Sequence, residues 1–318
     1  MADLVPQLRS TLPAVLQDAG EGAAERVIEF FTAEIRNENT RAAYARAVRR
    51  FFRWADQRGL NLFDIEPVHV AAYVEEDGRA PATIKQNLAA LRRLFDFLVT
   101  GQVLSSNPAE PVRSPKLETD GGKTPALTAG EARELLDSIV AGKQELPQLR
   151  DRALIGVMTY TFARVSAVTG LDVGDYFQAG RRWKIRLREK GGQRRTVPVH
   201  HKAKECLDVY LDEARIREDR EAPLFQSLKG RTGKLTSNRL LADNALQMVK
   251  RRAEEAGFDP AQVTCHTFRA TGITTFLEDG GDLETAQHIA GHASANTTRI
   301  YDHRDQQVAQ EEIERVRM

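Results

Sequence analysis

Apolar residues recur every three or four positions over much of this 318-residue chain, which is the spacing of one buried helix face. After a short leader, residues 1–24, the pattern predicts four amphipathic helices within residues 25–108. The second is the clearest, because Val48, Phe51 and Phe52 share one face while arginines occupy the other. We therefore expect a compact four-helix domain at the start of the chain.

The periodic pattern stops between residues 109 and 126, where the segment PVRSPKLETDGGKTP has three prolines, two glycines and no apolar repeat. This composition is typical of a linker. Thr128 and Glu131 then form a capping box that begins a second domain, residues 127–302. We expect this domain to be mostly helical, with one β-hairpin that carries Lys190 at its tip.

Two further helices are predicted in the C-terminal half of the chain. A longer apolar repeat predicts a helix over residues 237–257. The final segment, residues 303–318, also reads as a helix, but Val308, Ile313 and Val316 make only a thin apolar stripe. Such a stripe is too narrow to hold firmly in its own core, so we expect this tail to dock on another protomer, with a frayed terminus as the alternative.

The candidate chemistry gathers in the segment HTFRATGITTFLEDGGDLETAQHIAGHASANTTRIY. His266 and Arg269 lie one helical turn apart. The next predicted helix runs from an N-cap at Asp282 to Gly291, His292 follows it, and Tyr301 closes the segment. Displacement at a phosphodiester needs cationic donors on the non-bridging oxygens and a nucleophile in line, and the phenol is the plausible nucleophile here. A solvated helix face with a core aromatic is the alternative reading of these four residues.

One more arginine, Arg164, lies where an apolar helix breaks, so its charge is either paired or held for a ligand. With Arg164 included, the candidate residues follow the order and approximate spacing R…K…HxxR…GH…Y. In this signature the chain resembles the tyrosine recombinase (phage integrase) family. The resemblance covers residues 25–302 and rests on Arg164, Lys190, His266, Arg269, His292 and Tyr301.

This resemblance implies an N-terminal SAM-like core-binding domain and a C-terminal α+β catalytic domain. It also implies site-specific cleavage and rejoining of DNA through a 3′-phosphotyrosyl intermediate, without a metal, a cofactor or ATP. Arg164 and Arg269 would clamp the scissile phosphate, His266 and His292 would hydrogen-bond it or assist proton transfer, and Lys190 would protonate the departing 5′-oxygen. The nucleophile would be the phenol of Tyr301. The partners implied are double-stranded DNA and further copies of the chain, as a tetramer on two sites, with any accessory proteins unidentified.

The chain departs from the family pattern at two positions. Ala167 stands where many relatives have an acidic residue, and Ala270 stands where a second histidine is common. The first change removes an expected supporting carboxylate, for which Asp172 and Asp175 are the candidate substitutes.

The net charge of +1 gives no general support to nucleic-acid binding, so basic residues must be considered by position. Two neighbouring helices of the first domain carry basic faces that suit phosphate contact, although such faces are more often simply solvated. The candidates are Arg46, Arg49, Arg50, Arg53, Lys85, Arg92 and Arg93.

A metal site is one alternative to a recombinase site. His288 and His292 have metal-ligand spacing, but no third ligand is evident, and the two cysteines have no ligand spacing.

The absence of a signal peptide and of a long apolar run leads us to expect a cytoplasmic, nucleoid-associated protein.

A type IB topoisomerase shares the chemistry, but the integrase-like first domain and linker disfavour it. A DNA-binding regulator derived from a decayed integrase has only Ala167 in its support.

Overall fold

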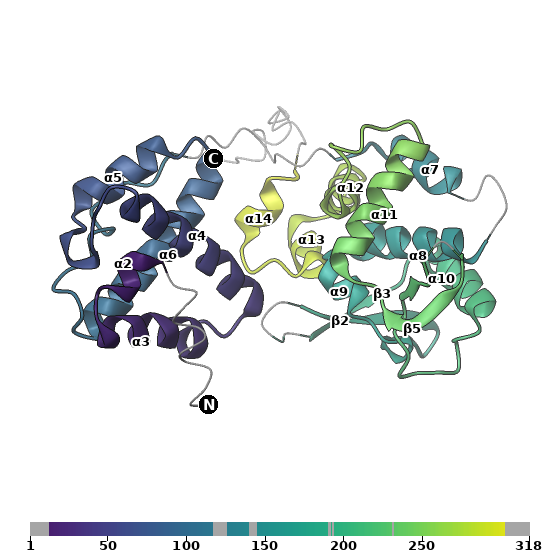
Figure 1. Cartoon of the computed structure of the whole chain (residues 1–318). Coiled ribbons are helices and arrows are strands. Elements are labelled where there is room, and N and C mark those ends of the chain that lie inside the picture. The colour runs from purple at the N-terminus through teal and green to yellow at the C-terminus, as the bar shows by residue number, and fades with distance from the viewer. Residues whose placement is uncertain are drawn as a thin grey trace, which may run out of the picture. The chain divides into compact units, whose positions relative to one another are not determined.

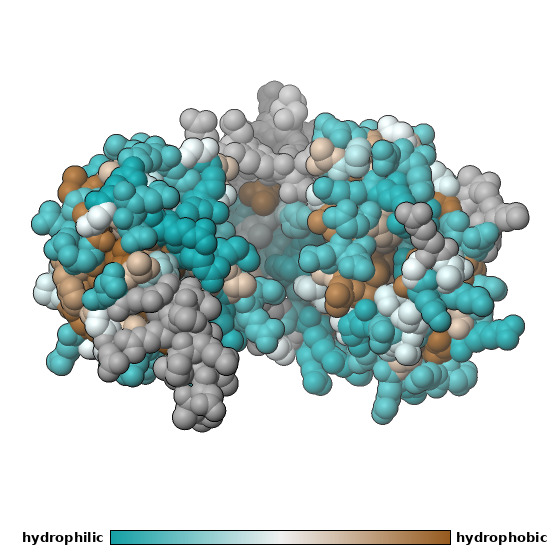
Figure 2. Space-filling model, viewed as in Figure 1, coloured by the Kyte–Doolittle hydropathy of each residue, from teal (hydrophilic) through white to brown (hydrophobic). Residues whose placement is uncertain are grey.

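The computed structural model describes residues 13–116, 126–139, 145–189, 192, 194–230 and 232–302. It divides into two compact units, residues 1–119 and 120–318, each with its own hydrophobic core (Figure 1). Both units are mostly helical, as the sequence predicted, and the second also contains two small antiparallel sheets, where the sequence predicted a single hairpin. Hydrophilic residues predominate on the face shown in Figure 2, with smaller apolar patches between them.

The first unit is entirely helical over the residues that the structure describes. Its elements are α2 (Ala14–Gln17), α3 (Glu21–Glu29), the π-helical turn η1 (Phe30–Glu34), α4 (Glu38–Asp56), the 3₁₀ turn η2 (Leu62–Asp64), α5 (Pro67–Glu76) and α6 (Pro81–Thr100). The four predicted helices correspond to α3 with η1, α4, α5 and α6.

The core of the first unit extends past the predicted range of residues 25–108 at both ends. Leu16 of α2 is fully buried, so the expected leader contributes to the core. At the other end Ala109 is fully buried and Val112 nearly so, and the Arg92 side chain donates to both of their carbonyl oxygens. The first part of the predicted linker is therefore folded onto α6, while residues 117–125 lie outside the described ranges.

The second unit combines helices with two small antiparallel sheets. Its elements are α7 (Ala129–Ser138), α8 (Leu146–Thr161), α9 (Val165–Thr169), η3 (Val173–Asp175), β1 (Tyr176–Ala179), β2 (Arg182–Arg188), β3 (Arg194–Pro198), α10 (His201–Ala214), β4 (Gln226–Leu228), β5 (Leu235–Arg239), α11 (Ala242–Glu255), α12 (Cys265–Glu278), α13 (Leu283–Ala290) and α14 (Ala295–Arg299). Thr128 and Glu131 form the predicted capping box at the start of α7.

The predicted hairpin is present as β2 and β3, and a third strand extends it. Ile185 of β2 pairs with Val197 of β3 on one side and with Tyr176 of β1 on the other. All three side chains are buried, so one face of the sheet contributes to the core. Lys190, between β2 and β3, lies outside the described residues.

The helix predicted over residues 237–257 is wrong at its start. Leu235–Arg239 pairs with β4 as strand β5, and α11 begins only at Ala242. Leu240 is buried but Leu241 is 64% exposed, so the two leucines do not share a helical face. The prediction began too early because the apolar spacing of α11 continues back through the mixed polar and apolar residues of β5.

Helix α12 packs very closely against the end of α8. A methyl group at Gly272 would lie 2.0 Å from the backbone oxygen of Thr159 and 2.8 Å from the ring of Phe162. Only glycine fits this approach without moving the backbone. The contact fixes α12 relative to the break after α8, and both of these places carry candidate site residues.

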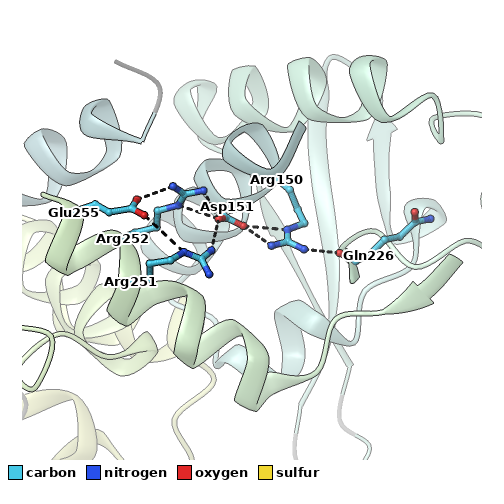
Figure 3. Close-up of polar contacts among 6 residues, drawn as sticks. All are labelled: Arg150, Asp151, Gln226, Arg251, Arg252 and Glu255. Carbon is cyan, nitrogen blue, oxygen red and sulfur yellow. Dashed lines mark hydrogen bonds and ion pairs between the residues drawn. The ribbon is translucent and has the colours of Figure 1, made fainter. Parts of the chain in front are cut away.

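A buried ionic network joins α8, α11 and β4 (Figure 3). Asp151 is fully buried and accepts two hydrogen bonds each from Arg150 and Arg252. Arg150 also donates to the backbone oxygen of Gln226, and Arg252 pairs with Glu255. The carboxylate of Asp151 therefore connects the three elements through charged hydrogen bonds.

No helix in the described part of the chain is long and apolar enough to span a membrane.

Candidate active site

The break after α8 positions Arg164. The helix ends at Thr161 because Phe162 adopts a left-handed conformation, with φ of 53°, and the backbone then turns so that Arg164 becomes the N-cap residue of α9. The side chain of Arg164 is 41% exposed, so its guanidinium remains accessible at the surface.

Helix α12 carries His266 and Arg269 in its first turns, after a capping box formed by Thr264 and Thr267. Arg269 is only 1% exposed, and its two terminal nitrogens donate to the backbone oxygens of Phe162 and Ala290, the latter at 2.9 Å. Its guanidinium therefore joins the break after α8 to the end of α13.

Helix α13 begins and ends where the sequence predicted. Asp282 caps its start, and Gly291 ends it in the left-handed conformation, with φ of 62°. The next residue, His292, is buried, and its Nδ1 lies 2.9 Å from the hydroxyl of Thr298 in α14. Helix α14 then brings the chain back to Tyr301.

Tyr301 lies against both histidines. Its hydroxyl is 2.9 Å from Nε2 of His266, and its ring stacks on His292 with 6.2 Å between the ring centres and 9° between the planes. The tyrosine is only 5% exposed. Residues distant in sequence are thus brought together around one phenol.

The electrostatics of the cluster set the protonation of these groups. Burial lowers the pKa of His292 to about 4, with further lowering from Arg269 and Arg164, and it lowers the pKa of His266 in the same way. Burial raises the pKa of Tyr301, although the two arginines oppose this. At neutral pH the imidazoles are therefore uncharged and the phenol keeps its proton.

Burial and the neighbouring Arg164 also lower the pKa of Arg269, to about 10, which leaves it charged at neutral pH. Its Nε is buried and has no hydrogen-bond partner among the described residues. Such an unpaired donor and an excess of positive charge suit a site that receives an anion.

The comparisons with known proteins cover both units. The family model of the phage integrase family matches residues 125–308, and that of the phage integrase N-terminal SAM-like domain matches residues 29–102. The chain belongs to the phage integrase family of tyrosine recombinases. It is therefore a site-specific recombinase that cleaves and rejoins DNA strands, by the phosphotyrosyl mechanism general to the family.

Individual relatives agree with this assignment. The recombinase is 31% identical over 285 residues to tyrosine recombinase XerD of Chlorobaculum tepidum, covering 86% of this chain and 88% of that one. It is 31% identical to tyrosine recombinase XerC of Herpetosiphon aurantiacus, covering 83% and 84%. Its fold resembles that of the XerH site-specific recombinase bound to difH substrate, with a TM-score of 0.72 at 21% identity over 99% of this chain and 94% of that one.

The recombinase has a carboxylate at this site that the sequence analysis missed. Glu189, directly after β2, lies 2.8 Å from Nη1 of Arg164 and also binds Arg195 of β3. Asp172 and Asp175, the acids considered as substitutes for the one absent at Ala167, pair instead with arginines outside the cluster. Glu189 and Arg195 did not stand out in the segment REKGGQRR, because their pairing depends on the register of β2 and β3.

The proposed phosphate-contacting residues of the first unit are mostly on its surface. Arg46, Arg49, Arg50 and Arg53 are exposed on α4, and Lys85 and Arg93 are exposed on α6. Arg93 forms an ion pair with Glu34 at 2.7 Å. Arg92 differs, since its guanidinium is occupied by the carbonyl oxygens of residues 109 and 112. Its first role is therefore to hold the chain that follows α6.

Among the described residues, His288 and His292 are not arranged as ligands of one metal ion. His288 is exposed on α13, whereas His292 is buried and its Nδ1 is directed to Thr298. Within the described ranges, no three side chains of histidine, cysteine, aspartate or glutamate gather as metal ligands would.

Proposed function

We propose that Tyr301 is the nucleophile of this recombinase and that Arg164, Lys190, His266, Arg269 and His292 complete its catalytic set. The observation that carries the proposal is the 2.9 Å contact between the Tyr301 hydroxyl and Nε2 of His266. Because the imidazole is neutral and the phenol protonated, His266 is suited to accept the phenol proton as attack begins.

In the proposed reaction the phenol oxygen of Tyr301 bonds to the scissile phosphorus while the bond to the 5′-oxygen breaks. Arg164 and Arg269 neutralise the charge on the non-bridging oxygens, and Lys190 gives its proton to the leaving 5′-oxygen. Rejoining reverses these steps, as an incoming 5′-hydroxyl attacks the phosphotyrosyl bond. The bond energy is retained throughout, so no external energy source is needed.

The test is covalent trapping on a nicked duplex from which the cleaved strand end diffuses away. In EDTA, the wild-type protein should give a protein–DNA band that withstands SDS, and Tyr301→Phe should give none. Tyr160→Phe is a suitable control, because the ring of Tyr160 stacks on His200, which is not a member of the proposed catalytic set. A band with Tyr301→Phe would mean that another residue is the nucleophile. Lack of cleavage by the wild type on any candidate site would favour a DNA-binding regulator.

The role proposed for Lys190 has a separate chemical test. Sulfur at the 5′-bridging position leaves without protonation, so a 5′-phosphorothiolate substrate needs little acid assistance. Lys190→Ala should cleave normal DNA slowly and the sulfur substrate at close to the wild-type rate. If Lys190→Ala slowed the cleavage of both substrates equally, Lys190 would not be the group that protonates the 5′-oxygen.

We also propose that the recombinase binds double-stranded DNA and works as a tetramer on two sites. Structural neighbours support this, since they include a lambda integrase tetramer bound to a Holliday junction. The exposed basic residues of α4 and α6 are the proposed phosphate contacts in the first unit. Strand exchange between two sites, measured against relaxation of one supercoiled plasmid, distinguishes this function from that of a type IB topoisomerase.

The tail, residues 303–318, lies outside the described residues, and we propose that it docks on a neighbouring protomer. Its thin apolar stripe supports the proposal. Truncation after Asp302 should leave binding to a single site nearly unchanged but abolish assembly of two sites and recombination. A truncated protein that recombines at the normal rate would show that the tail is dispensable.

A further inference from the structure

Glu189 occupies a central position among the charged groups of the proposed active site. Its Oε2 accepts a hydrogen bond from Nη1 of Arg164 at 2.8 Å, and its Oε1 accepts two from Arg195, at 3.0 Å and 2.9 Å. The Glu189 side chain is 7% exposed and that of Arg195 is 11% exposed. The contact with Arg195 is therefore largely shielded from water, where charged hydrogen bonds are strongest, whereas Arg164 remains partly exposed.

Arg195 extends this connection to the turn that carries His292. One of its terminal nitrogens donates to the backbone oxygen of Ile289, in the last turn of α13. A methyl group at Gly291 would lie 3.0 Å from Nε of Arg195 and 3.7 Å from the carboxyl carbon of Glu189. The glutamate and arginine therefore pack directly against the residue that precedes His292.

The contact with Arg164 restrains a partly exposed side chain. An arginine that is 41% exposed loses considerable rotamer entropy if it must meet a phosphate in one orientation. A fixed carboxylate on one terminal nitrogen restrains that orientation in advance and leaves the other donors of the guanidinium for an anion.

We propose that Glu189 is a positioning residue for strand cleavage, which holds Arg164 in the orientation that receives the scissile phosphate. The inference rests on the proposed catalytic role of Arg164. Glu189, directly after β2, thus supplies the supporting carboxylate that Ala167 on α9 cannot provide.

The test is a double-mutant cycle on single-turnover cleavage of the nicked duplex, with Glu189→Gln, Arg164→Ala and the two combined. Glutamine keeps the size of the side chain, but its amide cannot accept hydrogen bonds at both ends. Glu189→Gln alone should lower the cleavage rate roughly ten- to a hundredfold. It should add almost nothing to Arg164→Ala, because the residue through which it acts is already absent. Glu189→Asp, which keeps the charge but shortens the reach, should fall between Gln and the wild type.

Two controls separate positioning from other effects. Asp208→Asn removes a carboxylate that bridges Arg217 and Tyr176, neither of which contacts the cluster, and should leave the cleavage rate within twofold of wild type. The 5′-phosphorothiolate substrate should show the same loss with Glu189→Gln as normal DNA does. Rescue by sulfur would mean that the glutamate acts through the neighbouring Lys190, which contradicts the inference.

Three further outcomes would overturn the inference. A wild-type rate for Glu189→Gln, or a loss that multiplies unchanged onto that of Arg164→Ala, would refute positioning while leaving the proposed function intact. A wild-type rate for Arg164→Ala would instead contradict the proposed catalytic set, and the inference with it.

Discussion

Replacement of Asp151 by asparagine should severely destabilise the second unit. The carboxylate is fully buried, accepts four hydrogen bonds from Arg150 and Arg252, and lies 3.6 Å from Arg251. Removal of one partner from a buried ionic network leaves the remaining charges desolvated, which costs about 3–5 kcal/mol. Glu255, the acid that also contacts Arg252, is half exposed and cannot replace the buried charge.

For a unit of this size each kcal/mol lowers the Tm by roughly 2–4 °C, so the expected decrease is about 6–20 °C. The chain has two tryptophans, one in each unit, so in a Trp54→Phe background the fluorescence of Trp183 reports on the second unit. Glu255→Gln is the matched control, because Glu255 is half exposed and a solvent-screened pair contributes only about 0–1 kcal/mol. If Asp151→Asn lowered the Tm no more than Glu255→Gln, the buried network would not stabilise the unit as argued.

Three further predictions follow from individual residues. The pKa of His292 is about 4 in the folded chain against 6.5 for a free imidazole, so the unfolded chain takes up this proton first. The free energy of unfolding should therefore fall as the pH drops from about 6.5 to about 4, and His292→Gln should flatten that part of the profile; an unchanged profile would contradict the assignment. Gly272→Ala should lower both stability and cleavage, because its methyl group would overlap the backbone of α8, whereas Gly22→Ala in α3 meets nothing within 4 Å and should be neutral or slightly stabilising in thermal unfolding. Replacing Arg49 and Arg50 by alanine should make the log–log salt dependence of DNA binding shallower by roughly two units, and an unchanged slope would mark them as solvated residues.

Local sequence signals predicted the elements that carry the candidate site. Asp282 and Gly291 mark the ends of α13 in the sequence, and the structure caps that helix at these residues. The spacing of His266 and Arg269 likewise placed them together on one helix, which the structure shows as α12. Caps and apolar periodicity act within a few residues, so they can be identified without knowledge of the fold.

The features that were missed depend on contacts between distant segments. Glu189 meets Arg164 only because the end of β2 lies beside the break after α8, and Arg269 reaches the carbonyl of Phe162, 107 residues away in sequence. Arg92 shows the converse case. Its position on an arginine-rich helix face suggested a free cation, but the chain after α6 folds back and occupies its guanidinium.

The most direct test of the central claim is to identify the residue that becomes linked to DNA. The wild-type protein is trapped on a nicked duplex, the complex is digested with protease and nuclease, and the modified peptide is sequenced by mass spectrometry. Of the six tyrosines in the chain, Tyr301 should carry the nucleotide through a bond to the 3′-phosphate. A nucleotide on any other residue, or a link to a 5′-phosphate, would contradict the account.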